Sequence, residues 1–114
     1  MADWKHWHLE TDADNIAWLA FDRADTSTNT FSSDVLHELA TICAALTSAA
    51  PKGLVIQSAK ENGFAAGADI DEFTTLKNPE EAYAFTKLGN DVYDQVEALP
   101  FPTCAAIDGA ALGG

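Results

Sequence analysis

Positive charge is scarce in this sequence of 114 residues: 6 Lys and Arg residues stand against 18 Asp and Glu residues, for a formal net charge of −12. Surfaces that bind nucleic acid or anionic membranes need clustered lysine and arginine side chains. Here the basic residues are scattered along the chain. The charge therefore argues against both kinds of surface, and a phosphate-bearing ligand would depend on one or two local basic side chains.

Long apolar runs are absent, and cysteines are few. No uninterrupted apolar run approaches the roughly 20 residues of a membrane-spanning helix. The first residues, Met1–Lys5, lack the basic-then-apolar pattern of a secretory signal. The two cysteines, Cys43 and Cys104, both fall in apolar periodic stretches, which favours buried reduced thiols over a disulfide. Together these absences predict a cytoplasmic protein.

Two strands are expected near the N-terminus, over residues 4–9 and 15–21, joined by a turn-rich tetrapeptide. Both faces of the second strand are apolar, which predicts that both are covered. His6 and His8 stand two apart, a spacing that can bind metal, but no third ligand is evident, so we expect solvent-facing histidines and no metal site. The three tryptophans could stack on a base but fit hairpin and core packing better: Trp4, Trp7 and Trp18.

Two helices and two further strands follow. Residues 33–49 carry apolar residues at helical spacing, with Ser32 or Ser33 as the N-cap and Asp34 in the first turn. The short apolar run Leu54–Ile56 is typical of a buried parallel strand. The second helix begins at Pro79, and its expected apolar face consists of Tyr83, Phe85, Leu88, Val92, Tyr93, Val96 and Leu99.

Asn78 is the expected N-cap of this second helix, and Glu81 stands in the capping-box position. Gly89 inside the helix costs roughly 1 kcal/mol relative to alanine, which predicts close packing against a neighbour. Prolines end the helix, and Thr103–Ile107 is predicted to be another buried strand. The order β-β-α-β-α-β predicts an α/β fold.

Two glycine-bounded segments, Gly63–Ile70 and Pro102–Gly114, carry the chemistry. Each follows a predicted buried strand and leads toward a helical turn, whose first N–H groups have no intrahelical acceptor. Two such groups converging from two directions could hold an enolate or tetrahedral oxyanion. The alternative is a pair of tight strand-to-helix turns. Neither segment has the spacing of a dinucleotide loop, and no Gly-Lys-Ser/Thr follows.

Residues Gly63–Phe73 and, about thirty residues later, Leu99–Gly114 resemble the two signature regions of the crotonase (enoyl-CoA hydratase/isomerase) superfamily. The first reads Gly-Phe-Ala-Ala-Gly-Ala-Asp-Ile-Asp-Glu-Phe, and the second contains Leu-Pro-x-Pro-Thr and ends Ala-Leu-Gly-Gly. Asn29–Ser32 resembles the family's Asn-rich approach to the first helix. The second helix and its exit are most similar to the hydratase portion of multifunctional fatty-acid oxidation α chains.

The resemblance implies an α/β fold of the crotonase type, a spiral of β-β-α repeats that binds acyl-coenzyme A. It implies that the backbone N–H groups of Ala68 and Gly114 form an oxyanion hole. Arg23 would lie near the coenzyme A phosphates, with a solvated loop arginine as the alternative. The coenzyme A thioester is the expected substrate, with no cofactor, in a homo-oligomer or multienzyme complex. The pantetheine and thioester would be lined by Ala66, Gly67, Asp69 and Ile70.

The family's two catalytic glutamates would both follow Gly114. None of the acids near the motifs matches their positions: Asp69, Asp71, Glu72 and Asp108. We therefore expect residues 1–114 to be the N-terminal part of a single crotonase-fold domain, cut within the second oxyanion motif and inactive alone. The expected activity of the whole protein is enoyl-CoA hydration or isomerisation in fatty-acid β-oxidation. The alternatives are another thioester chemistry (isomerisation, decarboxylation or hydrolysis) and a non-catalytic crotonase-like module.

Overall fold

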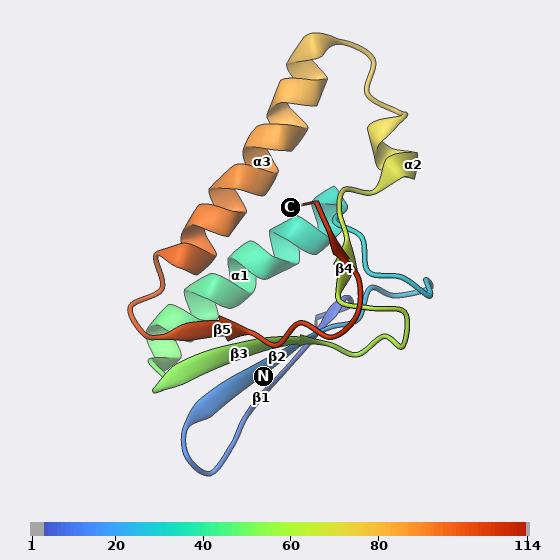
Figure 1. Cartoon of the computed structure of the whole chain (residues 1–114). Helices are drawn as coiled ribbons and strands as arrows, with labels where there is room; N and C mark the ends of the chain where they lie inside the picture. The colour runs from blue at the N-terminus through green and yellow to red at the C-terminus, as the bar shows by residue number, and fades with distance from the viewer. Residues whose placement is uncertain (1–3, 114) are drawn as a thin grey trace.

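The computed structural model describes residues 4–113, which form an α/β structure of three helices and six strands (Figure 1). The order contains the predicted β-β-α-β-α-β, with two short strands added within the glycine segments and a short helix, Ile70–Phe73, after the first of these segments. The elements are β1 (Trp7–Thr11), β2 (Ile16–Phe21), α1 (Ser33–Ala49), β3 (Gly53–Ser58), β4 (Ala65–Ala66), α2 (Ile70–Phe73), α3 (Pro79–Glu97), β5 (Thr103–Ala105) and β6 (Ala111–Leu112).

The strands form two sheets. The larger has the order β1-β2-β3-β5, with β1 antiparallel to β2 and the other neighbours parallel. The smaller consists of β4 and β6, which pair in parallel. Parallel neighbours need long connections, and here α1 and α3 supply them. The register of the large sheet places Glu10, Trp18, Val55 and Cys104 in one row across it.

Helix α1 forms as its sequence predicts. The Ser32 side chain is the N-cap and accepts a hydrogen bond from the Val35 N–H at 3.2 Å. The helix ends at Ala50, which adopts the left-handed conformation and donates its N–H to Leu46 O at 2.8 Å. All six residues of the predicted apolar face are buried: Val35, Leu36, Leu39, Ile42, Cys43 and Leu46. This face packs on the sheet and forms the main core.

The core between α1 and the sheet is built around two stacked aromatic rings. The ring centroids of Trp7 and Phe21 lie 4.2 Å apart, and Trp7 Nε1 donates to Val35 O at 3.1 Å. On the opposite face of β2, Trp18 remains 38% exposed, with its Nε1 donating to Asp12 Oδ2. The prediction that both faces of this strand are covered is therefore wrong for the described residues, because α1, the helix that packs on this sheet, lies on the other side.

Other burial predictions also differ from the structure. Cys43 is buried, but Cys104 in β5 is exposed, so only one of the two thiols is a core residue. All three residues of β5 are exposed, which contradicts the predicted buried strand. His6 precedes β1 and is buried, because its Nδ1 accepts the Ala24 N–H at 3.0 Å and its own N–H donates to Glu38 Oε1. Only His8 of the two histidines faces solvent.

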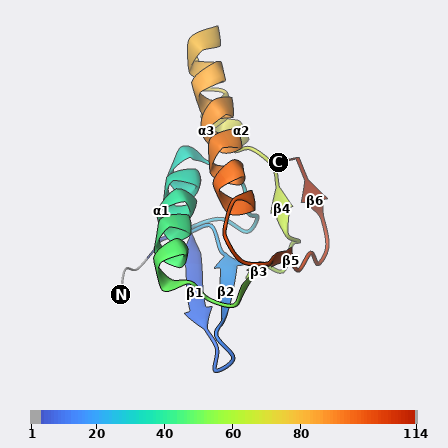
Figure 2. The same ribbon diagram turned by 90° about the vertical axis from the view of Figure 1, so that its left-hand side faces the viewer.

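Helix α3 packs on α1 through its C-terminal half, while its N-terminal half extends beyond the body of the molecule (Figures 1 and 2). The Asn78 side chain caps it by accepting the Glu81 N–H at 2.9 Å, as predicted. Of its predicted apolar face only Val92 is buried within the helix, and Tyr83 is 68% exposed. A Cβ on Gly89 would lie 3.9 Å from Leu36 Cδ1, an ordinary contact, so the predicted close packing at this glycine is wrong.

Candidate functional site

The two glycine-bounded segments lie side by side. Strand β4 pairs in parallel with β6, Ala65 with Ala111 and Ala66 with Leu112 (Figure 2). The segments therefore reach the site as neighbouring parallel strands and not from two directions. A glycine with positive φ flanks each strand at both ends: Gly63 (105°), Gly67 (80°), Gly109 (83°) and Gly113 (67°).

These glycines allow the two backbones to approach more closely than side chains would permit. A Cβ built on Gly63 would lie 2.9 Å from Ala110 N, and one built on Gly113 would lie 3.1 Å from the Cα of Gly67. Real Cβ atoms do not tolerate the first distance, and positive φ is unfavourable for any other residue at these positions. The glycine pattern thus reflects backbone pairing as well as access for a ligand.

The segment before α1 holds the end of β4 in place. Asn29 O accepts the Ala66 N–H at 2.8 Å, Phe31 N–H donates to Gly67 O at 2.8 Å, and Asp69 N–H donates to Phe31 O at 2.9 Å. These bonds make Phe31 and Ala68 partners in a parallel bridge. The bridge uses the groups on either side of Ala68, so the Ala68 N–H points away from Phe31.

Ala68 is exposed, and its N–H donates no hydrogen bond among residues 4–113. A backbone donor held on both sides and left without an acceptor is what an oxyanion site requires. Ala66 and Gly67 lie directly before it, and Ile70 opens α2 with its side chain 75% exposed. The second predicted donor, Gly114, lies outside the described residues.

Arg23 and Asp69 form an ion pair beside this donor. Arg23 Nη2 donates to Asp69 Oδ2 at 2.9 Å, and Nη1 donates to the hydroxyl of Thr30. The Arg23 side chain is 19% exposed, so it is not a solvated loop arginine. The other carboxylate oxygen of Asp69 accepts the Asp71 N–H and caps α2. Both side chains therefore fix the start of α2 relative to the loop that follows β2.

The Glu72 carboxylate, like that of Asp69, makes hydrogen bonds that hold α2 in place. It accepts hydrogen bonds from the backbone N–H of Ser33 at 3.0 Å and from the Ser33 hydroxyl at 2.9 Å. This places a negative charge at the positive end of α1 and joins α2 to it. With Asp69 and Glu72 occupied by structural hydrogen bonds, neither is free to act as a general base.

Asn29 is a buried polar residue whose role the sequence did not reveal. Its side chain is fully buried, and Nδ2 lies within hydrogen-bond distance of Phe21 O, Ser58 Oγ and Phe64 O, while Oδ1 accepts the Arg23 N–H. It thereby joins the ends of β2 and β3 to the segment leading into β4. The only signal in the sequence was its place in the Asn-Thr-Phe-Ser stretch before α1.

Lys60 is the second residue that sequence reasoning missed. Its Nζ donates to Arg23 O at 2.7 Å and Thr26 O at 2.6 Å, and pairs with Asp22 Oδ1 at 2.8 Å. His8 Nε2 lies 2.9 Å from the other oxygen of Asp22. Lys60 and then His8 lower the pKa of Asp22 below its ordinary value. Lys60 therefore holds the loop that carries Arg23.

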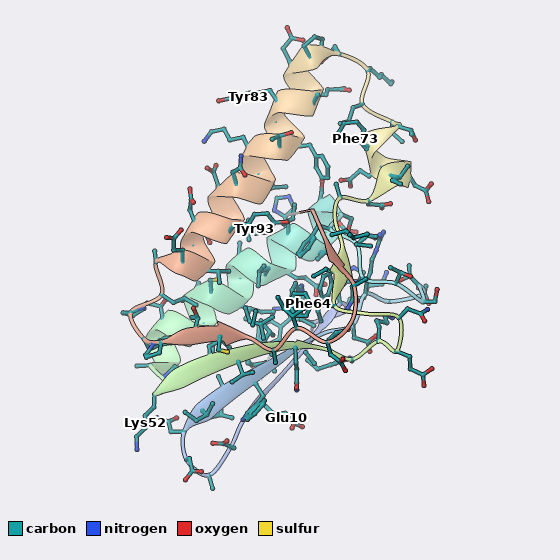
Figure 3. All side chains as sticks on the ribbon, viewed as in Figure 1. Glu10, Lys52, Phe64, Phe73, Tyr83 and Tyr93 are labelled. Atoms are coloured by element: carbon teal, nitrogen blue, oxygen red, sulfur yellow. The ribbon has the colours of Figure 1, made fainter. Side chains whose placement is uncertain are left out.

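A cleft of about 170 Å³ opens beside Ala68, between α3 and the segment Phe31–Leu36. Its wall is mostly apolar and aromatic: Phe31, Leu36, Phe73, Phe85 and Tyr93, with Thr86, Gly89 and Asn90 from the middle turns of α3. Figure 3 shows Phe73 on α2 and Tyr93 on α3. The rings of Phe31 and Tyr93 meet edge to face with centroids 5.5 Å apart, and burial raises the pKa of Tyr93. The cleft and the Ala68 N–H together suit a ligand with a carbonyl oxygen and an apolar tail.

No group of three His, Cys, Asp or Glu side chains between residues 4 and 113 is placed to hold a metal ion. No helix in that range has both the length and the apolar character needed to cross a membrane.

Known proteins resemble the chain in both sequence and structure. Residues 11–114 match the enoyl-CoA hydratase/isomerase family. The fatty acid oxidation complex subunit alpha of Vibrio vulnificus is 37% identical over 115 residues, and that of Vibrio parahaemolyticus is 38% identical; each match covers 100% of this chain. The chain spans 16% of the length of these two relatives.

Solved structures agree. An enoyl-CoA hydratase/carnithine racemase from Magnetospirillum magneticum superposes with a TM-score of 0.86 at 29% identity, covering 97% of this chain and 42% of that one. The enoyl-CoA hydratase of Bacillus anthracis gives a TM-score of 0.82 at 26% identity, covering 91% of this chain and 40% of that one. The crotonase-type fold expected from the two glycine segments is thereby confirmed, and the chain belongs to the enoyl-CoA hydratase/isomerase family.

Proposed function

We propose that residues 4–113 carry the carbonyl-binding part of an enoyl-CoA hydratase/isomerase site that acts in fatty-acid β-oxidation. The observation that carries this proposal is the Ala68 N–H, which has no acceptor among the described residues and lies at the mouth of an apolar cleft. The cleft would take the acyl chain, while the N–H would donate to the thioester oxygen. The family and the two Vibrio relatives support the choice of substrate class.

The chemistry follows from where charge develops. When water adds across the double bond conjugated to a thioester, its oxygen bonds to Cβ and negative charge moves to the carbonyl oxygen as an enolate. A fixed N–H donor stabilises that charge, and a single such donor typically contributes about 3 kcal/mol to the transition state. Protonation at Cα then completes hydration. We propose the N–H of Gly114 as the second donor.

The proton transfers require a carboxylate within hydrogen-bond reach of Cα or of the attacking water. Asp69 and Glu72 are already engaged by Arg23 and Ser33, so we assign neither to this step. The part of the site described here therefore supplies binding and electrostatic stabilisation.

The coenzyme A moiety would lie along the exposed backbone around Ala68. We propose that the pantetheine and thioester contact Ala66, Gly67, Asp69 and Ile70. Arg23 is a proposed contact for the coenzyme A phosphates, because a guanidinium has five N–H donors and, among residues 4–113, Arg23 uses one from Nη1 for Thr30 and one from Nη2 for Asp69. We also propose a cytoplasmic multienzyme assembly like the one named for the Vibrio relatives.

The test uses the full-length gene product and crotonyl-CoA, whose conjugated-thioester absorbance falls when the double bond is hydrated. We expect turnover, and we expect calorimetry to show tighter binding of an acyl-CoA than of ATP. Acyl-CoA binding without turnover would favour a non-catalytic module of the same fold. Tighter binding of ATP would contradict the proposed ligand class.

A further inference from the structure

Gly89 in α3 has no structural need to be glycine. It lies in the middle of a helix, and its φ is not positive. Apart from the backbone of the helix itself and the two chain neighbours, the one atom of residues 4–113 within 4 Å of a Cβ built there is Leu36 Cδ1, at 3.9 Å, which is an ordinary van der Waals contact. Apart from proline, glycine is the residue that least favours a helix interior. The backbone would therefore accept alanine, so the space beside this position, and not backbone geometry, accounts for the glycine.

That space is the cleft next to Ala68. Phe85, Gly89 and Tyr93 are spaced four residues apart, so they form one stripe along α3, and all three line the cleft. Leu36 of α1 forms the wall behind Gly89. A side chain at position 89 would therefore project between the two aromatic side chains and occupy the cleft.

We infer that Gly89 determines the length of the acyl chain this site accepts, by leaving the cleft open between Phe85 and Tyr93. This inference rests on the proposed function, since it takes the cleft as the acyl site. A short enoyl group would reach little beyond the carbonyl held at Ala68, whereas a long one would pass along α3 at Gly89. A larger side chain at position 89 should therefore lower kcat/KM selectively for substrates with long acyl chains.

The experiment measures kcat/KM of the full-length gene product for a four-carbon and a ten-carbon enoyl-CoA. Gly89→Leu is expected to lower the ratio of ten-carbon to four-carbon kcat/KM by about tenfold or more, because one displaced methylene in a hydrophobic pocket changes discrimination by 10- to 200-fold, roughly. Gly89→Ala is expected to lower the ratio less and to raise the melting temperature, since it improves helix propensity.

Ala82→Leu is the matched control. Ala82 lies seven residues earlier on the same side of α3 but does not line the cleft. We expect it to leave the chain-length ratio as in the wild type. The inference would be overturned if Gly89→Leu had the same ratio of ten-carbon to four-carbon kcat/KM as Ala82→Leu, or if Gly89→Leu lost kcat/KM equally for both substrates. Wild-type turnover would still support the proposed function in that case. Wild-type protein that neither turns over nor binds an acyl-CoA would overturn both.

Discussion

Gly67 and Gly113 face each other across the parallel pair of β4 and β6, so closely that a Cβ on Gly113 would lie 3.1 Å from the Cα of Gly67. Four residues earlier in each segment, Gly109 and Gly63 repeat the arrangement, with a Cβ on Gly109 at 3.0 Å from the Cα of Gly63. The two glycine-bounded segments therefore pack directly against each other through their backbones. Pairing at this distance fixes the strand end that presents Ala68.

Replacing Gly67 with alanine should destabilise the protein. The new Cβ would lie 3.2 Å from Leu112 O, and φ at this position is +80°. A non-glycine residue held in such a conformation costs about 1–3 kcal/mol, so we expect the free energy of unfolding to fall by that amount. Urea denaturation measures it. Gly53→Ala is the control, because its Cβ would meet Pro102 O at 3.4 Å without a positive φ. Equal losses in the two variants would contradict the steric argument.

Replacing Ala68 with proline removes the proposed oxyanion donor. The substitution leaves the bonds of Gly67 O and Asp69 N–H to Phe31 available, because neither uses the Ala68 N–H. We expect turnover of crotonyl-CoA by the full-length gene product to fall about 100-fold or more, the usual effect of losing one such donor. Phe64→Leu, a change to a half-buried packing residue four positions earlier, should cost far less. Small and equal losses of turnover in the two variants would contradict the assignment of Ala68 to the site.

Local signals predicted the helices well. Helix α1 spans Ser33–Ala49 as expected, because its cap at Ser32 and its apolar spacing are both properties of neighbouring residues. The same holds for Asn78 at the start of α3. The first glycine-bounded segment could also be predicted, since Gly63 and Gly67 both adopt positive φ within a short span.

Features that depend on contacts between distant residues could not be predicted from the sequence. The pairing of β4 with β6 joins residues more than forty positions apart, and nothing near Ala65 specifies Ala111 as its partner. Apolar character at Trp18 and Cys104 predicted burial, but burial also depends on which elements cover that face of the sheet. His6 shows the converse: a polar ring is buried because the Ala24 N–H, eighteen residues away, supplies its hydrogen bond.

Asn29 is expected to be the most sensitive polar position outside the donor itself. Asn29→Ala leaves Phe64 O and the Arg23 N–H without their side-chain partner in a part-buried site, whereas Phe21 O keeps the hydrogen bond from the Ala59 N–H. Each unsatisfied buried group costs about 1–3 kcal/mol, so the free energy of unfolding should fall by about 2 kcal/mol or more. Asn62→Ala is the matched control, since this exposed asparagine makes one hydrogen bond, to Ser27 O. A loss for Asn29→Ala no larger than for Asn62→Ala would contradict this assignment.

The Asp22 carboxylate contributes to the free energy of unfolding, and this contribution depends on pH in a defined way. Lys60, at 2.8 Å, is the main cause of its lowered pKa, and His8 is the second. Because the folded pKa lies below the ordinary value of 3.8, the unfolded chain binds more protons between the two values, and stability rises with pH there. The contribution is complete above about pH 5 and is lost as the pH falls through the folded pKa.

Asp22→Asn should therefore lower the urea midpoint at pH 7, and the difference from wild type should shrink as the pH falls below 3.8. Asp25→Asn removes the same charge from the same loop, but Asp25 has no ion-pair partner among residues 4–113. Its effect on the midpoint should be smaller at pH 7 and should not show this dependence. A difference for Asp22→Asn that stays constant from pH 7 down to about pH 3 would mean that the substituted amide disturbs the loop sterically, and that the pair with Lys60 does not stabilise the fold.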